Sequence, residues 1–310
     1  MKRKTDYLEE RIQSNYKKSV LFGYIPIGIL IALYAAFLVW YPLWENPLVD
    51  AGVLYQSTYV VGIIMLLHTG LYQNYTKKAN KEKRYMADTF WYILAYAASL
   101  VPILIVCAVL LGKFETVQGY YIKEVGLGMT TARNISIYGA LLAGPFFAHL
   151  LLLLPHYRDR KKAYMDLTVV AVLCVVVFGK LGCHAAGCCE GVHMDPIWFG
   201  RGRFPVQLLE TICIFLTIGF LMWYQLKAKW AIPGSAYALG LLLYCPVRFF
   251  WEYFREQEGY IKMFVFNGSM TFWQFLSIIG FVMGAVWMAY IVVKDKKEKA
   301  AKKIAEESAA

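Results

Sequence analysis

Charged residues are scarce in this chain. Only 17% of its 310 residues are Asp, Glu, Lys or Arg, whereas 59% are hydrophobic and the mean hydropathy is +0.47. A soluble domain would carry about 25% charged residues. The sequence also has no internal repeat, and it lacks the alternating ten-residue pattern that is typical of a transmembrane β-barrel. These absences exclude a soluble protein and favour a helical membrane protein.

Long apolar runs take up most of the sequence. Each is close to the roughly 20 residues that a helix needs to cross a bilayer. We delimit eight such segments: 19–40, 53–75, 87–112, 135–155, 164–181, 206–226, 233–254 and 271–293. The expected fold is therefore an all-α integral membrane protein, a bundle of about eight transmembrane helices. The transmembrane domain covers residues 19–293, with basic cytoplasmic tails at 1–18 and 294–310. We expect the second tail to be frayed, and the first is too long and too charged for a cleavable signal peptide.

The basic residues lie in short loops and tails. The chain has 32 Lys and Arg against 21 Asp and Glu, and basic stretches precede the first segment and follow the second, fourth, sixth and eighth. By the positive-inside rule, this pattern predicts both termini in the cytoplasm. The connection between the fifth and sixth segments then faces outward, as does the loop after the seventh. No basic face lies outside these loops, so nucleic-acid binding is not indicated.

The seventh segment carries a charged face. Tyr244, Arg248, Glu252 and Arg255 are spaced i, i+4, i+8 and i+11, so they lie on one side of a helix. A charge inside an apolar segment costs about 2.5 kcal/mol or more, which makes Arg248 a functional candidate. Its natural partner is Glu252 or an anion that arrives from outside. The alternative is an Arg–Glu pair that only joins helices.

Two further stretches contribute polar side chains. In RFPVQLLE (203–210), Gln207 and Glu210 share a face at the outer start of the sixth segment. A buried Glu210 would need a cation, which Arg248 or Arg255 could supply; a solvated helix start is the alternative. In SIYGALLAG (136–144), Tyr138 could donate a hydrogen bond into a site, although packing is the more common role of such a segment.

The connection at 178–203 is unusual because it holds several potential metal ligands. These are Cys183, His184, Cys188, Cys189 and His193. We expect a tight, polar re-entry of the chain at the outer face of the membrane. Thiolates and imidazoles bind zinc or copper, but this spacing matches no standard metal motif. A disulfide between Cys183 and Cys188 or Cys189, or cysteines that pack as small hydrophobic residues, are the alternatives.

These stretches, taken in order, resemble the prolipoprotein diacylglyceryl transferase family. GKLGCHAAGCCEG (179–191) is similar to the family signature GRxGNFxNGExxG, FPVQLLE (204–210) to HPSQLYE, and YCPVRFFWEYFRE (244–256) to YGxxRFxxEFxRE. GSMTFWQFLSI (268–278) resembles the start of the last family helix, and SIYGALLAG stands where the family has SFHGGLIG. The resemblance covers about residues 135–290.

The resemblance implies a reaction at the outer face of a bacterial plasma membrane. The diacylglyceryl group of phosphatidylglycerol passes to the lipobox cysteine of a prolipoprotein, and glycerol phosphate leaves. The implied partners are phosphatidylglycerol, the prolipoprotein signal peptide and membrane lipids, with no cofactor and no metal. The implied catalytic residues are Arg248, Tyr138, His184 and Glu252. The implied substrate-binding residues are Lys180, Gly191, Gln207, Glu210, Tyr244 and Arg255.

The chain departs from the family pattern at several positions. Tyr138 stands for a family His, Lys180 for Arg, Cys183 and Ala186 for Asn, Cys188 for Glu, and Phe204 for His. Lysine offers a point charge where arginine offers a planar fork. Two readings follow. Either the catalytic base has moved to His184 or His193, or the chain is a divergent paralogue, a lipid-binding, thiol-redox or metal-binding membrane protein without transferase activity.

Overall fold

The structure is a computed structural model that describes residues 25–41, 51–76, 90–96, 98, 142, 144–154, 161–187, 191–194, 202–255 and 270–309. Within these ranges the regular elements are helical. They are α2 (Ile25–Trp40), α3 (Ala51–Thr76), α6 (Gly144–Leu151), α8 (Lys161–Ala186), α9 (Val206–Lys227), α10 (Ala236–Trp251), the 3-10 helix η4 (Glu252–Phe254) and α11 (Phe272–Ala309). Two isolated β-bridges join Gly191 with Arg255 and His193 with Arg203.

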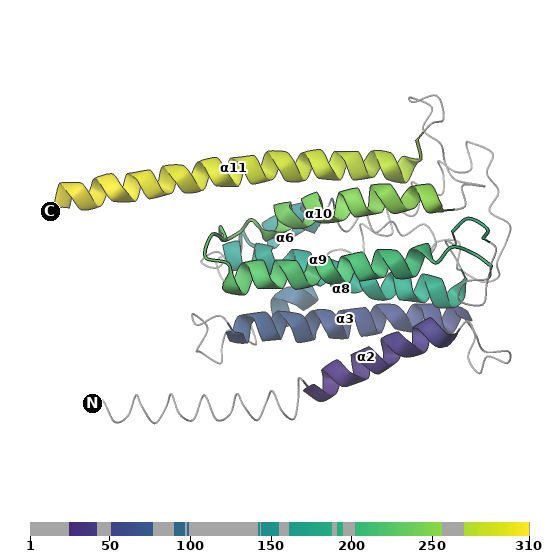
Figure 1. The fold of residues 1–310 in the computed structure, drawn as a ribbon. Coiled ribbons are helices and arrows are strands. Elements are labelled where there is room, and N and C mark those ends of the chain that lie inside the picture. Colours follow the sequence, from purple (N-terminus) through teal and green to yellow (C-terminus); the bar gives the residue numbers. More distant parts are fainter. Residues whose placement is uncertain are drawn as a thin grey trace, which may run out of the picture.

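Helix α8 lies at the centre of the bundle (Figure 1). It packs against α2, α3, α6, α9 and α10, while α11 packs along the outside of α10. Helix α8 is apolar over most of its length, which is typical of a helix in a protein core or in a bilayer, and here neighbouring helices surround it. Nearly all of its residues from Tyr164 to Ala185 are buried. Polar residues of α8 such as Lys180 are therefore buried among the surrounding helices.

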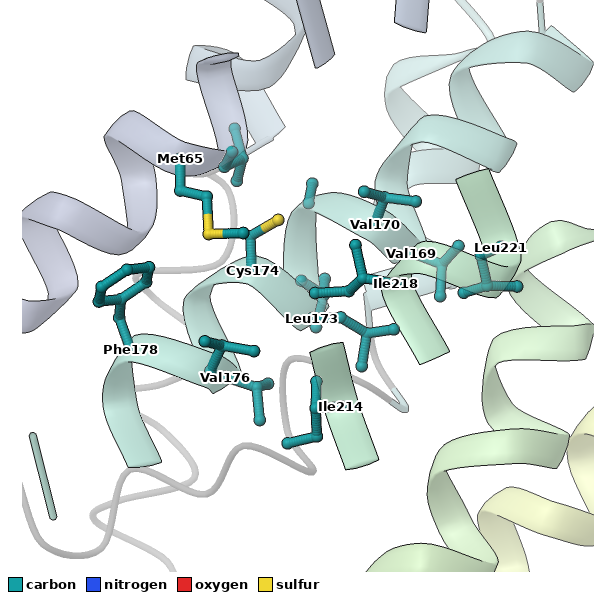
Figure 2. Packing of buried hydrophobic residues seen from close by; sticks show 14 of the residues in the cluster. Met65, Val169, Val170, Leu173, Cys174, Val176, Phe178, Ile214, Ile218 and Leu221 are labelled. Atoms are coloured by element: carbon teal, nitrogen blue, oxygen red, sulfur yellow. The ribbon is translucent and has the colours of Figure 1, made fainter. Parts of the chain in front are cut away.

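The core between α3, α8 and α9 consists of interlocking aliphatic side chains (Figure 2). Met65 of α3 lies beside Cys174 and Phe178 of α8, and Ile214 and Ile218 of α9 pack on the other side of α8. These side chains are almost completely buried. Dispersion contacts among them, rather than hydrophobic exclusion from lipid, hold the helices together inside a membrane. The core fixes the relative positions of α8 and α9, on which the polar residues described below depend.

Three helices among the described residues are long and apolar enough to cross a membrane. They are Lys161–Ala186, Val206–Lys227 and Trp273–Ser308, and two shorter apolar helices cover Ile25–Trp40 and Ser57–Thr69. The outer side of α11 exposes large hydrophobic residues such as Phe281, Val282 and Val286, which suits contact with lipid. The all-helical prediction is confirmed for the described residues. The number of eight crossings stays a prediction, since much of 87–112 and 135–155 lies outside these residues.

Two of the sequence predictions were wrong in detail. Helix α8 continues to Ala186, so residues 178–186 are helical and do not form a re-entrant loop; Gly187, with φ 69°, ends the helix in the conformation that glycine adopts most easily. Helix α11 continues to Ala309, so the tail 294–309 is not frayed. Ion pairs one turn apart, such as Asp295–Lys299 with N···O 2.6 Å, support this extension. The predicted tail 1–18 lies outside the described residues.

Asp166 joins α8 to the start of α10. Its Oδ2 accepts a hydrogen bond from the Gly234 N–H and its Oδ1 from the Ala236 N–H, both at 2.9 Å. The first N–H groups of a helix have no partner within the helix, and here a carboxylate of a neighbouring helix supplies it. This contact fixes α10 against α8 at one end of the bundle. The candidate site lies at the other end.

Candidate functional site

Among the described residues, five charged side chains meet at the end of the bundle where α8 and α10 finish and α9 begins. They are Lys180 of α8, Glu210 of α9, Arg248 of α10, Glu252 of η4 and Arg255, which follows η4. None of their side chains is more than 7% exposed. We call these five residues the ionic cluster. Three cations and two carboxylates leave an excess of one positive charge.

Glu210 is the centre of the ionic cluster. Its Oε2 lies 2.8 Å from Lys180 Nζ and 3.0 Å from Arg255 Nη2, and its Oε1 lies 3.7 Å from Arg248 Nε. From the sequence, we expected a buried Glu210 to need Arg248 or Arg255. The structure brings it to both, and to Lys180 as well. A fully buried carboxylate is stable only with such partners, because leaving water costs several kcal/mol.

Glu252 is the second carboxylate of the ionic cluster. Its Oε2 lies 2.6 Å from Arg248 Nη1 and 3.5 Å from Arg255 Nε, at helical spacings of four and three residues. The hydroxyl of Thr271, just before α11, is 3.4 Å from its Oε1 and can donate to it. Glu252 therefore holds both arginines and also joins the end of α10 to the beginning of α11.

The start of α11 is a capping box, in which two residues cap the helix reciprocally. The Gln274 N–H donates to Thr271 Oγ1 at 3.2 Å, and the Thr271 N–H donates to Gln274 Oε1 at 3.0 Å. The spacing Thr-x-x-Gln before an apolar run is a known sequence signal for this arrangement. Sequence reasoning did not use it, so Thr271 and Gln274 were missed as neighbours of the ionic cluster.

Gly191 positions the backbone of Arg255. The segment 191–194 lies against both 202–204 and 254–255, with the Val192 N–H donating to the Phe254 carbonyl at 2.9 Å and the Phe204 N–H to the Val192 carbonyl at 3.0 Å. A Cβ at Gly191 would lie 2.3 Å from the Phe204 carbonyl oxygen. No side chain fits in that space. The glycine lets the chain approach closely enough to hold Arg255 at the ionic cluster.

The other residues singled out in the sequence lie in different surroundings. Gln207, Tyr244 and His184 are buried, and His184 is one turn beyond Lys180 on α8. His193 is exposed, on the segment that pairs with Arg203. Tyr138, Cys188 and Cys189 lie outside the described residues. Among the described residues, no group of three His, Cys, Asp or Glu side chains is arranged to hold a metal ion.

The ionic cluster is chemically suited to an anion. Buried charges are stable when partners of opposite charge surround them, and three of the five side chains of the ionic cluster are cations. Arginine side chains offer several N–H donors in a plane, which matches the oxygens of a phosphate. The bundle with its ionic cluster defines a helical membrane protein with a polar, cationic site among its helices.

Comparison with known proteins identifies the family. The family profile of prolipoprotein diacylglyceryl transferase matches residues 51–290, and the chain belongs to this family. It is 27% identical over 175 residues to the phosphatidylglycerol–prolipoprotein diacylglyceryl transferase of Clostridium tetani (strain Massachusetts / E88), covering 53% of this chain and 64% of that protein. It is 30% identical over 166 residues to the protein of the same name from Campylobacter curvus (strain 525.92), covering 52% and 59%.

A third relative carries a numbered name. It is phosphatidylglycerol–prolipoprotein diacylglyceryl transferase 2 of Clostridium perfringens (strain 13 / Type A), 29% identical over 174 residues that cover 52% of this chain and 64% of that protein. The chain thus spans about three fifths of the length of these curated relatives. All three relatives are bacterial and are named as transferases.

Proposed function

We propose that this protein transfers the diacylglyceryl group of phosphatidylglycerol to the lipobox cysteine of a prolipoprotein. The observation that carries the proposal is the ionic cluster, a buried set of three cations and two carboxylates. Phosphatidylglycerol carries one negative charge on its phosphate, so its headgroup would balance the excess. The names of the relatives support the same pair of substrates.

The charge of the leaving group explains why the reaction needs the ionic cluster. The thiolate of the acceptor cysteine attacks the glycerol carbon of the diacylglyceryl group, a carbon–sulfur bond forms, and the carbon–oxygen bond to the phosphate breaks. The electron pair of that bond remains on glycerol phosphate, whose negative charge rises. We propose that Arg248 stabilises this charge. It is a residue of α10 and lies near the carboxylates of both Glu210 and Glu252.

The proton of the acceptor thiol needs a base, since the thiolate is the nucleophile. His184 is our first candidate because it is buried and lies one turn beyond Lys180 on α8. Tyr138, at the position of a family His, is the second. We assign Gln207 and Tyr244, both buried, to hydrogen bonds with oxygens of the lipid.

The distribution of lysines supports an outward orientation of the site. Lys161 and Lys162 begin α8 and Lys227 ends α9, at the ends of these helices opposite the ionic cluster. Lys294 follows the apolar part of α11, one turn before Glu298, which pairs with Lys162. Basic residues of multi-pass proteins collect on the cytoplasmic side. In the proposed orientation, both termini are cytoplasmic and the ionic cluster faces outward.

Reconstitution of the purified chain tests the proposal. The chain is placed in vesicles of phosphatidylglycerol and phosphatidylcholine with a peptide that carries a lipobox cysteine, and the peptide mass is followed. We expect the mass to rise by one diacylglyceryl group, only when phosphatidylglycerol is present. Arg248→Ala should abolish the rise. A correctly folded wild-type chain that never modifies the peptide, in vesicles or in cells depleted of their own transferase, would refute the proposal.

A second function is favoured by one observation. Cys183, which replaces a family Asn, is half-buried on α8 between Lys180 and His184, close to the ionic cluster. A thiol beside cations is a candidate for redox chemistry. Under this alternative, the wild type lipidates no peptide but carries out a thiol-dependent reaction, and Cys183→Ser abolishes that reaction. Under the transferase proposal, Cys183→Ser keeps most of the transfer activity.

A further inference from the structure

The side chain of Gln274 has an unused hydrogen-bonding group next to the ionic cluster. The residue is 1% exposed, and its Nε2 has no acceptor among the described residues. Leaving such a donor buried and unpaired costs about 1–3 kcal/mol. Nearly all buried polar groups in folded proteins have a partner, so an exception calls for an explanation.

The capping box fixes which way the amide faces. Gln274 Oε1 accepts the hydrogen bond of the Thr271 N–H at 3.0 Å. Exchanging the amide oxygen and nitrogen would set an N–H group against another N–H group, so this orientation is the only one that the cap permits. The two N–H groups of Nε2 therefore take no part in the cap and need acceptors elsewhere.

The register between α10 and α11 places Gln274 at the level of the ionic cluster. A Cβ on Gly280 would touch Cys245 Sγ at 2.6 Å, and one on Gly284 would touch Leu241 Cβ at 2.9 Å, so the two helices run antiparallel in close contact. One to two turns back along α11 lies Gln274, beside the last turn of α10. The contact between Thr271 and Glu252 agrees with this register.

We propose that Gln274 is a substrate-binding residue whose Nε2 donates to a phosphate oxygen of the anionic lipid. The proposal rests on the proposed function, because it assumes that a phospholipid phosphate occupies the ionic cluster. Three features favour an oxygen anion as the acceptor: the three cations of the ionic cluster, the donor-only character of Nε2, and the positive end of the α11 helix dipole at this position.

Gln274→Glu is the most informative variant. A glutamate at this position keeps the capping box, since Glu and Gln serve equally well there. It removes the two N–H donors and adds a negative charge that cancels the excess. Gln274→Met is the second variant; it removes the donors without adding charge. Gln225→Glu is the matched control, because it makes the same charge change on α9 at the opposite end of the bundle.

Lipid binding is measured apart from transfer. Each purified variant in neutral detergent is titrated with phosphatidylglycerol or with phosphatidylcholine, and thermal unfolding is followed. For Gln274→Glu we expect phosphatidylglycerol to bind at least about 10-fold more weakly than to the wild type, the loss typical of a hydrogen bond to a charged group, with the unfolding temperature before lipid addition no lower than that of the wild type. In the transfer assay, KM for phosphatidylglycerol should rise more than kcat falls. Gln225→Glu should bind lipid as the wild type does.

The binding and transfer measurements distinguish a failure of the proposed function from a failure of the proposed role of Gln274. Wild-type chain that binds phosphatidylglycerol but transfers nothing would refute the proposed function and leave the role of Gln274 intact. Gln274→Glu or Gln274→Met binding phosphatidylglycerol within twofold of the wild type would overturn the role of Gln274 while the transferase proposal stands. If Gln274→Glu does not fold, Gln274→Met decides. A wild-type chain that does not distinguish phosphatidylglycerol from phosphatidylcholine would also overturn the role of Gln274.

Discussion

Replacing Glu210 with glutamine should destabilise the protein severely although the shape of the side chain is kept. Glu210 is completely buried and lies 2.8, 3.0 and 3.7 Å from three cationic groups. Glutamine removes its negative charge, so the excess in the ionic cluster rises from one positive charge to two. Removing one partner of a buried ion pair costs about 3–5 kcal/mol, because the other charge stays buried without compensation. We expect a loss of that size in the free energy of unfolding.

The measurement is unfolding of the purified protein in mixed micelles, driven by SDS and followed by tryptophan fluorescence. The control is Glu298→Gln, which breaks the exposed ion pair with Lys162 (N···O 3.4 Å, side chains 45% and 58% exposed). An exposed pair contributes about 0–1 kcal/mol, so the control should unfold like the wild type.

A second substitution tests whether charge is the cause. Combining Glu210→Gln with Lys180→Met restores the excess to one positive charge. The double variant should regain about 1–3 kcal/mol relative to Glu210→Gln alone, the range of coupling found between contacting residues. The reasoning is refuted if Glu210→Gln costs no more than Glu298→Gln, or if removing Lys180 makes the protein less stable still.

Three further predictions concern the residues around the ionic cluster. Gly191→Ala should lower the free energy of unfolding by about 1–3 kcal/mol, since its Cβ would overlap the Phe204 carbonyl oxygen, whereas Gly219→Ala, with open space around it, should not; equal effects in the unfolding assay would contradict this. Asp166→Asn should cost about 1–2 kcal/mol in the same assay because one of the two N–H groups at Gly234 and Ala236 loses its acceptor. Arg248→Lys keeps the charge but not both contacts, so the peptide-lipidation rate should fall about 10-fold or more with little change in stability; a rate like that of the wild type would argue against the proposed role.

The sequence was most informative where the signal is local. Spacings of three and four residues predicted that Arg248, Glu252 and Arg255 share one side of a helix. The structure shows Arg248 and Glu252 in contact at the end of α10, whereas Arg255 follows η4 in an extended conformation, outside the helix, and still contacts Glu252. The long apolar runs predicted an all-helical chain. Both arguments depend only on helix geometry and composition, which neighbouring helices change little.

Contacts between distant segments were beyond sequence reasoning. Nothing in the local pattern of Lys180 shows that it would lie 2.8 Å from Glu210, on another helix. The end of α8 was predicted too early because Gly179, Gly182 and the Cys and His residues that follow were taken as signs of a loop. The buried helix accommodates these two glycines, and only Gly187, with its positive φ, ends it. The cap formed by Thr271 and Gln274 did carry a sequence signal, the Thr-x-x-Gln spacing, and could have been predicted from it.

The two polar attachments between α8 and α10 also set the depth of the ionic cluster. Asp166 accepts a hydrogen bond from the first turn of α10. Lys180 pairs with Glu210, and Glu210 in turn contacts Arg248 in the last turn of α10. The two attachment points on α8 are separated by about 21 Å, at 1.5 Å per residue. The hydrocarbon layer of a bilayer is about 30 Å thick. Lys161, at the lysine-rich end of the bundle, precedes Lys180 by about 28 Å of helix at the same rise per residue. With the lysine-rich end at one boundary of this layer, the ionic cluster lies close to the other boundary, at a depth that a lipid headgroup can reach from the membrane surface.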